Sequence, residues 1–536
     1  MRSSLSPAFG LCFLALLTVD RLHATDYDVG PGKALETISE VPWESLDPGD
    51  TVRIHWRETP YREKWVIARQ GTEAAPITVS GVPNAEGELP VVSGRDATTR
   101  STLNFWNEER GVIKIGGSNV PADVVPSYIV VENLDIRSGR PPYTFTGRNG
   151  VASYRSNAAA IYLEKGSHIT IRNCILQDSG NGLFTASASS DVLVERCYLF
   201  DNGIEGSIFE HNNYSESEGI IFQFNRFGPL REECGGNNLK DRSTGLVIRY
   251  NWIEGGNRQL DLVDTDHFMG HPDYGNTYVY GNILVEFDGE GNSQMVHYGG
   301  DSGDESRYRQ GTLYFHHNTV VSTRTGNTTL IRLSSSGETA DVRNNVLYTT
   351  AEGNRLAILN TGGEVQLRGN WIKAGWRTSH DAPAGNVLDA GGNITGQEPG
   401  FVDAGGGDYA LVESSPCVDA GGVLAEAALG YEPMHRYVSH QSSASRTTEN
   451  SPDIGAYEFT TTRSDFNGDG RVDFDDFLTF AAAFGRTSTD STWNPAFDLD
   501  GDLRVGFGDF LEFAASFGRS FAFNPGCVAD SGCTNV

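Results

Sequence analysis

The segments Ile220-Ile-Phe-Gln-Phe-Asn225 and Leu246-Val-Ile-Arg-Tyr-Asn251 are two copies of one pattern, a short apolar run that ends in asparagine. Later copies end at Asn282, Asn318, Asn345 and Asn370, and earlier ones at Asn133, Asn173 and Arg196. Their spacings of roughly 23 to 40 residues are typical of solenoids, in which each turn stacks on the one before. In strands stacked ~4.8 Å apart, corner asparagines can adopt left-handed backbone conformations and hydrogen-bond their copies. The sequence therefore predicts an all-β fold, a parallel β-helix with a structural asparagine ladder.

Other repeat folds fit less well, because the leucine-rich motif is absent and the period is too irregular for propeller blades. The segments Tyr27-Asp-Val-Gly-Pro-Gly, Pro48-Gly-Asp-Thr-Val-Arg and Ala75-Pro-Ile-Thr-Val-Ser-Gly resemble the opening turns of secreted β-helix proteins of the polysaccharide-lyase type, the pectin lyase-like superfamily. Asp453-Ile-Gly-Ala-Tyr-Glu-Phe459 resembles the closing segment of such proteins. The resemblance implies a right-handed single-stranded β-helix over residues 25 to 459.

The ends and the charge of the chain bound its location and partners. Arg2, the apolar run from Ala8 to Val19 and Leu22-His23-Ala24 form the pattern of a secretory signal peptide over residues 1 to 24, too short to span a bilayer. We expect a secreted protein, extracellular or attached to a cell surface, without a transmembrane segment. The net charge of −29 argues against a nucleic-acid partner, because binding to nucleic acid depends on neutralising phosphates.

Export permits disulfides. Cys527 and Cys533 are close enough in sequence to close a small terminal loop. Cys174 and Cys197 occupy matching places in consecutive repeats, where a reduced core stack is at least as reasonable as a bond.

A locally basic stretch between Arg226 and Arg258 contains six basic residues against four acidic ones, so an acidic polysaccharide could bind there. Tyr214 lies eleven residues before Asn225, as Lys240 does before Asn251, and Asp261 lies 21 residues before Asn282, as His297 does before Asn318. With adjacent turns ~4.8 Å apart, we expect one outward column that spans ~14 Å and presents Tyr214, Lys240, Asp261 and His297. A second polar column would contain Asn212, Asn238 and Gln259, and a third Glu216 and Arg242.

The segments His211-Asn-Asn-Tyr214, Asn238-Leu-Lys240-Asp-Arg242-Ser243 and Asn292-Ser-Gln-Met-Val-His-Tyr298-Gly resemble segments of a widespread group of bacterial β-helix proteins. A more distant likeness is to the chondroitinase B and alginate lyase family, which uses a lysine base with an arginine on a later turn. That likeness implies Lys240 and Arg258 as the counterparts.

β-Elimination on a uronic acid explains these residue types, because the C5 proton leaves only when the neighbouring carboxylate is neutralised. Arg242 or Arg258 would neutralise the carboxylate. Lys240 would be the base, since a neighbouring cation lowers the pKa of a lysine. Tyr214 would protonate the leaving oxygen, and His211 or His297 is an alternative acid or base. Asn212, Asn238 and Arg258 are the candidates for substrate binding.

Other interpretations remain open at this stage. Lys240 is also explained as a solvated charge that pairs with Asp261. Asp261, Asp264 and Asp266 offer the paired carboxylates of an inverting glycoside hydrolase, or alternatively an additional calcium site near the groove. A non-catalytic carbohydrate-binding or cell-surface protein is the third class.

After a linker at residues 460 to 464, two segments 33 residues apart carry oxygen side chains at loop positions 1, 3, 5 and 12, the spacing of a calcium loop. Each is followed by an apolar run that predicts a helix. The expected ligands are Asp465, Asn467, Asp469, Asp473 and Asp476 in the first loop, and Asp498, Asp500, Asp502 and Asp509 in the second. The second loop has Leu503 where glycine is usual, and Gly506 at position 9. The pair resembles a type I dockerin over residues 465 to 520, followed by a tail at 521 to 536, which implies bound calcium and a cohesin-like or cell-surface partner.

Overall fold

The computed structural model of the protein describes residues 24–448, 450–459, 464–467 and 471–518. The predicted signal peptide lies outside these residues, except residue 24, and so do most of the predicted linker, Asp469, Cys527, Cys533 and the predicted tail. Within the described residues, no helix has the length and apolar character needed to cross a membrane.

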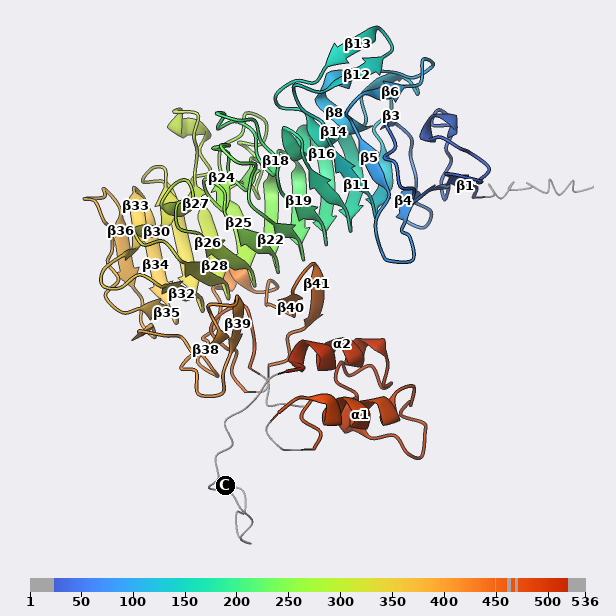
Figure 1. Ribbon diagram of the computed structural model, residues 1–536. Coiled ribbons are helices and arrows are strands. Elements are labelled where there is room, and N and C mark those ends of the chain that lie inside the picture. Colours follow the sequence, from blue (N-terminus) through green and yellow to red (C-terminus); the bar gives the residue numbers. More distant parts are fainter. Residues whose placement is uncertain (1–23, 449, 460–463, 468–470, 519–536) are drawn as a thin grey trace, which may run out of the picture.

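The chain winds into a right-handed parallel β-helix whose coils follow one another along a single axis (Figure 1). Its strands form three parallel stacks, which confirms the predicted fold class. The first stack consists of β1 (Asp26–Val29), β2 (Thr51–His55), β4 (Ile77–Val82), β10 (Ser127–Glu132), β14 (Ala159–Arg172), β16 (Asn181–Glu195), β19 (Glu218–Gln223), β22 (Thr244–Arg249), β25 (Asn276–Tyr280), β28 (Thr312–His316), β31 (Thr339–Arg343), β34 (Glu364–Arg368) and β36 (Asn386–Asp389).

The second stack contains shorter strands. It consists of β5 (Val91–Ser93), β11 (Asp135–Arg137), β15 (Ile175–Gln177), β17 (Tyr198–Leu199), β20 (Arg226–Phe227), β23 (Trp252–Glu254), β26 (Ile283–Glu286), β29 (Thr319–Ser322), β32 (Val346–Thr349), β35 (Trp371–Lys373) and β37 (Ile394–Gly396). Near the N-terminus, additional strands extend from the coils: β6 (Ala97–Thr99), β7 (Asn104–Phe105), β9 (Ser118–Val120), and the hairpin of β12 (Thr144–Gly147) and β13 (Gly150–Ser153).

The third stack carries the candidate site. It runs through β3 (Glu63–Ile67), β8 (Gly111–Ile115), the first halves of β14 and β16, β18 (Asn213–Ser215), β21 (Leu239–Asp241), β24 (Leu260–Leu262), β27 (Gln294–Tyr298), β30 (Thr328–Leu333) and β33 (Leu356–Thr361). Alternate side chains such as Leu239, Leu260 and Val296 are fully buried in the common core. Because neighbours in a strand point to opposite faces, the residues between them face outward.

The predicted asparagine ladder is present from Asn225 onward. The side-chain Nδ2 of each member donates to Oδ1 of the next member, over 2.9–3.1 Å. The members are Asn225, Asn251, Asn282, Asn318, Asn345, Asn370 and Asn393. Each acceptor oxygen also receives a backbone N–H of the preceding turn, so the corner has few unsatisfied polar groups.

Two expectations about these corners need correction or resolution. In the later turns the left-handed residue is the one before the ladder asparagine, for example Phe224 (φ 57°) and Tyr250 (φ 56°), because the asparagine side chain itself must point inward. Only the early copies Asn133 and Asn173 are left-handed themselves. Cys174 and Cys197 are buried free thiols that take the place of the ladder asparagine in their turns, so the reduced stack is the one observed.

The coils end at β37, earlier than the predicted boundary at residue 459. Residues 397–459 fold back along the second stack and include β38 (Phe401–Asp403), β39 (Asp408–Leu411), β40 (His435–Val438) and β41 (Ser442–Ser445). Their apolar residues, among them Tyr437 and Ile454, are buried against Trp252 and Trp371 of the coils. Beyond them lies a small lobe of two helices, α1 (Phe474–Ala483) and α2 (Phe507–Ser516), with its own core around Phe480 and Phe513.

Candidate active site

The predicted column is confirmed by the strand register. Tyr214 on β18 is the partner of Lys240 on β21, Lys240 is the partner of Asp261 on β24, and Asp261 is the partner of His297 on β27. The same column continues to Arg332 on β30. These residues therefore form the floor of one continuous surface across five turns.

This floor is enclosed by loops, which makes it a groove of about 820 Å³. One wall is the segment from Asp264 to His267 after β24, and another is the segment from Gly300 to Tyr308 after β27. Ile208 and Phe209 form part of the rim, and both are well exposed. The column is thus outward-facing relative to the core but covered from bulk solvent, and Lys240, Asp261 and His297 are each less than 7% exposed.

A chain of charged contacts runs along the floor. Lys240 Nζ lies 2.5 Å from Oδ2 of Asp261, whose Oδ1 lies 2.7 Å from Nδ1 of His297. Nδ2 of Asn237 also donates to Asp261 over 2.7 Å. Burial raises the pKa of Asp261, but Lys240 and His297 outweigh it and hold that pKa well below its usual range. Asp261 is therefore a fixed carboxylate with all its neighbours in place, and it has no proton to give.

Lys240 is a poor base in this setting. Burial lowers the pKa of Lys240, but the charges of Asp261 and Asp301 more than offset this effect, so the pKa lies above its ordinary value. The expectation that a neighbouring cation lowers this pKa is wrong, because Asp301, which no sequence pattern pointed to, adds a second carboxylate 2.7 Å from Nζ. Lys240 is held as an ammonium ion, and its interpretation as a solvated surface charge is also wrong.

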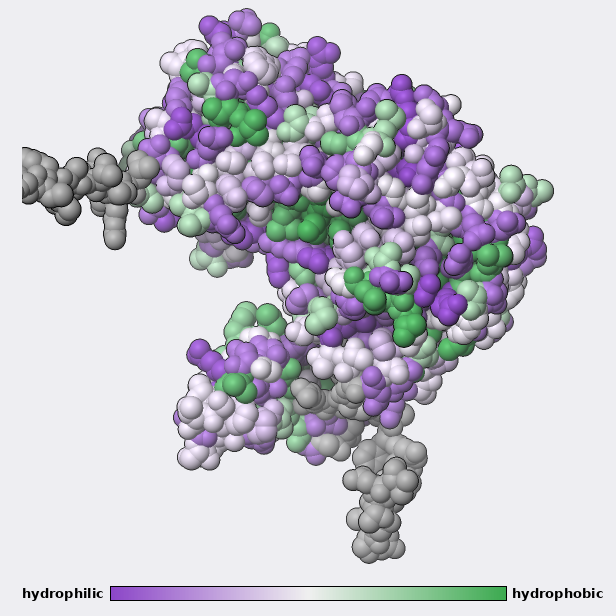
Figure 2. All heavy atoms as spheres, turned by 180° about the vertical axis from the view of Figure 1, so that it is seen from behind, coloured by the Kyte–Doolittle hydropathy of each residue, from purple (hydrophilic) through white to green (hydrophobic). Residues whose placement is uncertain are grey.

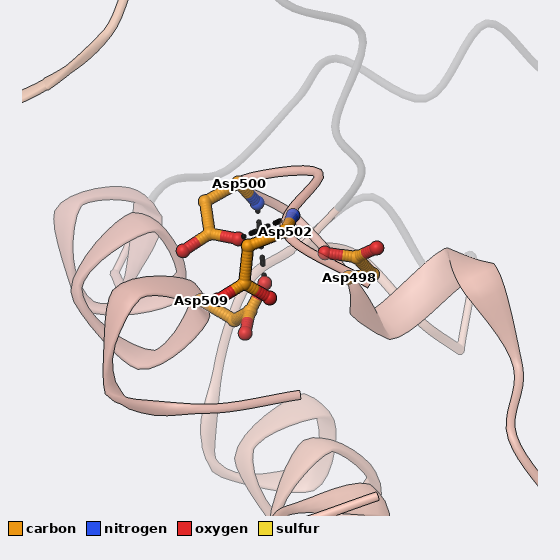
Figure 3. Close-up of side chains that lie close together, drawn as sticks. All are labelled: Asp498, Asp500, Asp502 and Asp509. Carbon is orange, nitrogen blue, oxygen red and sulfur yellow. Dashed lines mark hydrogen bonds between the residues drawn. The ribbon is translucent and has the colours of Figure 1, made fainter. Parts of the chain in front are cut away.

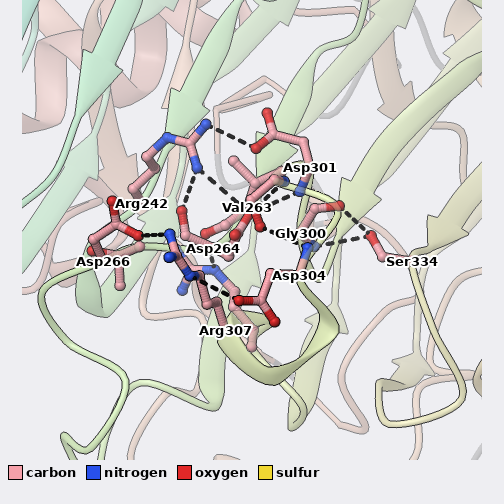
Figure 4. A network of polar contacts seen from close by, with 12 residues as sticks. Arg242, Val263, Asp264, Asp266, Gly300, Asp301, Asp304, Arg307 and Ser334 are labelled. Atoms are coloured by element: carbon pink, nitrogen blue, oxygen red, sulfur yellow. Dashed lines mark hydrogen bonds and ion pairs between the residues drawn. The ribbon is translucent and has the colours of Figure 1, made fainter.

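Arg242 organises the next part of the groove (Figure 4). Its Nη2 donates to Oδ1 of Asp301 over 2.8 Å, its Nη1 donates to the carbonyl of Asp264, and its Nε donates to the hydroxyl of Tyr214 over 2.8 Å. The Asp301 carboxylate therefore lies between two cations, with one oxygen on Lys240 and the other on Arg242. A carboxylate bound in this way is what the predicted chemistry requires of the substrate.

Tyr214 and His211 lie beside this cation pair. The Tyr214 ring stacks on Phe184 and on His211, with centroids 5.0 Å and 5.6 Å apart. Nδ1 of His211 accepts the backbone N–H of Asn237 over 2.8 Å, so the proton of the neutral ring is on Nε2. Burial and then Lys240 lower the pKa of His211 to about 3. His211 is therefore a neutral hydrogen-bond donor, which argues against its predicted acid or base role.

His297 orients other residues. Its Nδ1 faces Asp261, and its Nε2 lies 2.8 Å from Oγ of Ser334, which also contacts Gly300. Both ring nitrogens are occupied and the ring is 4% exposed, so His297 has no free nitrogen for a substrate. It links Asp261 to the base of the loop that carries Asp301.

Two predicted substrate-binding residues do not reach the groove. Asn212 and Asn238 are fully buried at an inner corner, where Nδ2 of Asn212 donates to Oδ1 of Asn238 over 2.8 Å and Nδ2 of Asn238 donates to the carbonyl of Glu254 over 2.8 Å. They are in one column, as expected, but that column is a second internal ladder. The prediction of substrate contact is wrong because β21 begins at Leu239, so the alternation of faces does not extend back to Asn238. Arg258 does line the groove.

The carboxylates of the hydrolase alternative are occupied by other contacts. Asp264 accepts the backbone N–H groups of Asp301 and Ser302 through Oδ1, and it therefore anchors the loop. Asp266 pairs with Arg307 at the rim (Figure 4). With Asp261 held by Lys240 and His297, none of these three carboxylates is presented as one of a free catalytic pair.

The C-terminal lobe contains the only cluster of at least three possible metal-binding groups within the described parts of the chain. Oxygens of Asp498, Asp500, Asp502 and Asp509 lie within 4.8 Å of one another (Figure 3). Asp509 accepts backbone N–H groups of Leu499, Asp500 and Gly506 and so closes the loop onto α2.

The first loop repeats this pattern as far as it is described. Asp476 accepts the N–H groups of Phe466, Asn467 and Asp473, and Asp473 is the N-cap of α1. Asp465 and Asn467 are within the described residues, whereas Asp469 is outside them. Leu503 has a φ of 69°, the conformation for which calcium loops use glycine.

The second loop fits a hard divalent cation. All its side-chain donors are carboxylate oxygens, the ligands that calcium prefers. Burial, together with the charges of Asp509, Asp502 and Asp498, raises the pKa of Asp500, so the loop is electrostatically unfavourable without a cation. An additional calcium ion near the groove stays a prediction.

Comparison with known proteins adds no identification. No protein-family model and no curated protein matches the chain. The crystal structure of pectate lyase Pel9A aligns with 82% of this chain and 98% of its own, at 13% identity and a TM-score of 0.44. A GH136 lacto-N-biosidase from Eubacterium ramulus aligns with 69% of this chain and 67% of its own, at 12% identity and a TM-score of 0.44. An alginate lyase from Paenibacillus sp. str. FPU-7 aligns with 65% of this chain and 93% of its own, at 12% identity and a TM-score of 0.30. Similarities this low carry no argument about the reaction or the substrate.

Proposed function

We propose that this chain is a secreted polysaccharide lyase that cleaves a uronate-containing polysaccharide by β-elimination in the groove. The observation that supports the proposal is the position of Asp301, whose two carboxylate oxygens lie on Lys240 Nζ and Arg242 Nη2. The same two cations would receive the carboxylate of a uronate in its place. Pairing with two fixed cations withdraws charge from that carboxylate and makes the adjacent C5–H acidic.

In this mechanism the two cations bind and Tyr214 transfers the proton. Burial lowers the pKa of Arg242, but Tyr214 and Asp301 outweigh it and raise that pKa, so Arg242 stays charged. Tyr214 begins the cycle as a phenolate against Nε of Arg242 and takes the C5 proton. The C5–H electrons form the C4–C5 double bond, the C4–O bond breaks, and Tyr214 returns the proton to the leaving oxygen. The Nε2–H of His211 is placed to donate a hydrogen bond to the sugar.

The test is turnover of a panel of uronate and sulfated polysaccharides by the full chain, followed by the absorbance of the unsaturated product. Tyr214→Phe should lower turnover at least ~100-fold, because a positioned proton-transfer group contributes about that much. Its unfolding midpoint should stay unchanged, since the stack on Phe184 is kept. Tyr314→Phe, on the outer face of β28, is the matched control with full turnover expected.

Other results would assign other functions. New reducing ends without an absorbance change would mean hydrolysis, and binding without either would mean a carbohydrate-binding protein. Full turnover by Tyr214→Phe would refute the proposed proton transfer.

We also propose that the C-terminal lobe is a dockerin-like calcium-dependent docking domain that binds a cohesin-like or cell-surface partner. The supporting observation is a duplicated set of exposed apolar residues 33 positions apart on the two helices, between 40% and 66% exposed. The pairs are Phe474 with Phe507, Leu478 with Leu511, and Phe484 with Phe517. Figure 2 shows apolar atoms on the surface of this lobe. Exposed apolar groups of this size are typical of a surface that binds a partner.

The test of docking is calorimetric binding of the full chain to a cohesin-like domain with calcium and with a chelator. Phe474→Ser combined with Phe507→Ser should abolish binding, whereas Val423→Ser, at an exposed apolar residue outside the lobe, should not. Binding that persists in the chelator would contradict the calcium dependence.

A further inference from the structure

Two arginines in the groove lack the carboxylate partners that its other buried cations have. Arg258 precedes β24 and is 9% exposed, and Arg332 lies on β30 in register with His297. Within the parts of the chain that the structure describes, neither guanidinium has a carboxylate within ion-pair distance. The Nε atoms of both are buried without a hydrogen-bond partner.

The neighbours of Arg258 and Arg332 are neutral amides. Nη2 of Arg258 donates to Oε1 of Gln294 over 2.9 Å, and Nε2 of Gln294 donates to Oδ1 of Asn360 over 3.2 Å. These contacts orient Arg258 but leave its charge uncompensated. Burial lowers the pKa of Arg258, and the nearby charge of Arg332 lowers it further, against the opposing effect of Asp261. Two like charges with unsatisfied donors are costly to bury unless an anion binds to them.

The distance along the groove is suited to a polymer. Lys240, Asp261, His297 and Arg332 occupy four consecutive turns. Three intervals of ~4.8 Å place Arg332 ~14 Å from Lys240, about the length of two or three sugar residues. Both arginines line the same groove as Lys240 and Arg242.

We infer that Arg258 and Arg332 form a second anion subsite, which binds a carboxylate or sulfate ester two or three sugars away from the residue held by Lys240 and Arg242. The inference rests on the proposed function for the identity of the polymer. The planar guanidinium fork matches the geometry of both kinds of oxyanion. The substrate would then carry negative charge on more than one sugar, and oligomers shorter than three residues would bind weakly.

The first experiment needs no sugar. The unfolding temperature of the full chain is measured in sodium sulfate and in sodium chloride at equal ionic strength, for the wild type, Arg332→Gln and Arg368→Gln. Arg368 is an exposed arginine on β34 outside the groove and serves as the matched control. Sulfate should raise the unfolding temperature of the wild type and Arg368→Gln by ~2 °C or more beyond its effect on Arg332→Gln. Equal sulfate responses in all three proteins would overturn the subsite.

The second experiment distinguishes the two anions by calorimetric titration. A galacturonate tetramer carries carboxylates alone, and a chondroitin sulfate tetrasaccharide carries carboxylates and sulfate esters. Arg332→Gln should weaken binding about tenfold relative to the wild type and Arg368→Gln, which corresponds to one lost charged contact. Weakening of both probes assigns a carboxylate, and weakening of the sulfated probe alone assigns a sulfate ester. Unchanged binding of both by Arg332→Gln would refute the inference.

The two proposals can fail separately. If the wild type cleaves no uronate polymer while Arg332→Gln still loses the sulfate response, the lyase proposal is wrong and the anion subsite stands. If a polymer is cleaved but Arg332→Gln behaves as wild type in both experiments, the lyase proposal stands and the subsite is wrong.

Discussion

Replacing Lys240 by methionine should destabilise the protein strongly, although the position was expected to tolerate truncation. The change removes the ammonium ion 2.5 Å from Asp261, a carboxylate only 3% exposed. Removing one member of a buried ion pair leaves an uncompensated charge and costs about 3–5 kcal/mol. Asp301 adds little to this cost, because its side chain is 35% exposed and water can solvate it.

The assay is urea unfolding of the full chain at pH 7, followed by circular dichroism. Adding Asp261→Asn to Lys240→Met should restore at least ~2 kcal/mol, because the amide needs no cation. Arg53→Met, which removes a partner from the exposed Asp26, is the surface control and should cost under ~1 kcal/mol. The folded-state pKa of Asp261 is depressed, so its stabilisation is present above the unfolded pKa of ~3.9 and is lost below it. The difference between wild type and Lys240→Met should therefore narrow below about pH 4. A Lys240→Met midpoint equal to wild type, or no rescue by Asp261→Asn, would refute this reasoning.

Four further outcomes are expected. Burial lowers the pKa of His316 to about 3, so the unfolded chain gains a proton below ~6.5 and the folded chain does not; this costs about 2 kcal/mol of stability by pH 5. His316→Phe, which keeps the stack on Tyr280, should remove that part of the difference between unfolding curves at pH 7.5 and pH 5. Asn282→Ala should cost at least ~3 kcal/mol in urea unfolding, because buried donors and acceptors on both sides lose partners, whereas Asn393→Ala at the partly exposed end should cost under ~1 kcal/mol. Asp301→Asn should tighten binding of an acidic oligosaccharide about tenfold in calorimetry, because no protein carboxylate then competes for the two cations; weaker binding would contradict the competition. Asp509→Ala should abolish the calcium-induced rise in the unfolding temperature of the C-terminal lobe, and a retained rise would exclude the second loop as its source.

The strands of the site were predictable because the asparagine corners fix the register. Equal distances from Lys240 and Tyr214 to their corner asparagines were enough to place both side chains in one column. A slip of one residue would have turned both side chains into the core, so the hydrophobic alternation supports the same register. The alternation fails only where a strand starts, which explains the wrong prediction for Asn238.

The environment of the column was not predictable, because loops supply it. Asp301 lies in a connection between β27 and β28 whose path is set by Asp264, a residue from the preceding turn. No local pattern records that contact, and the sign of the Lys240 pKa shift depends on it. Arg332 was missed for a related reason, since its distance to the next corner asparagine differs from the spacing shared by Asp261 and His297.

The asparagine ladder also gives the coil an electrical direction. Every side-chain amide from Asn225 to Asn393 donates toward the C-terminal end, so the amide dipoles add along the axis rather than cancel. The positive end of this row, Nδ2 of Asn393, donates to the carboxylate of Asp389 over 2.7 Å, and the negative end, Oδ1 of Asn225, accepts the backbone N–H of Cys197. Each bond in such a row polarises the next. The β-helix therefore contains a macrodipole made of side chains, and Asp389 neutralises its positive end as a carboxylate does at the N-terminus of an α-helix.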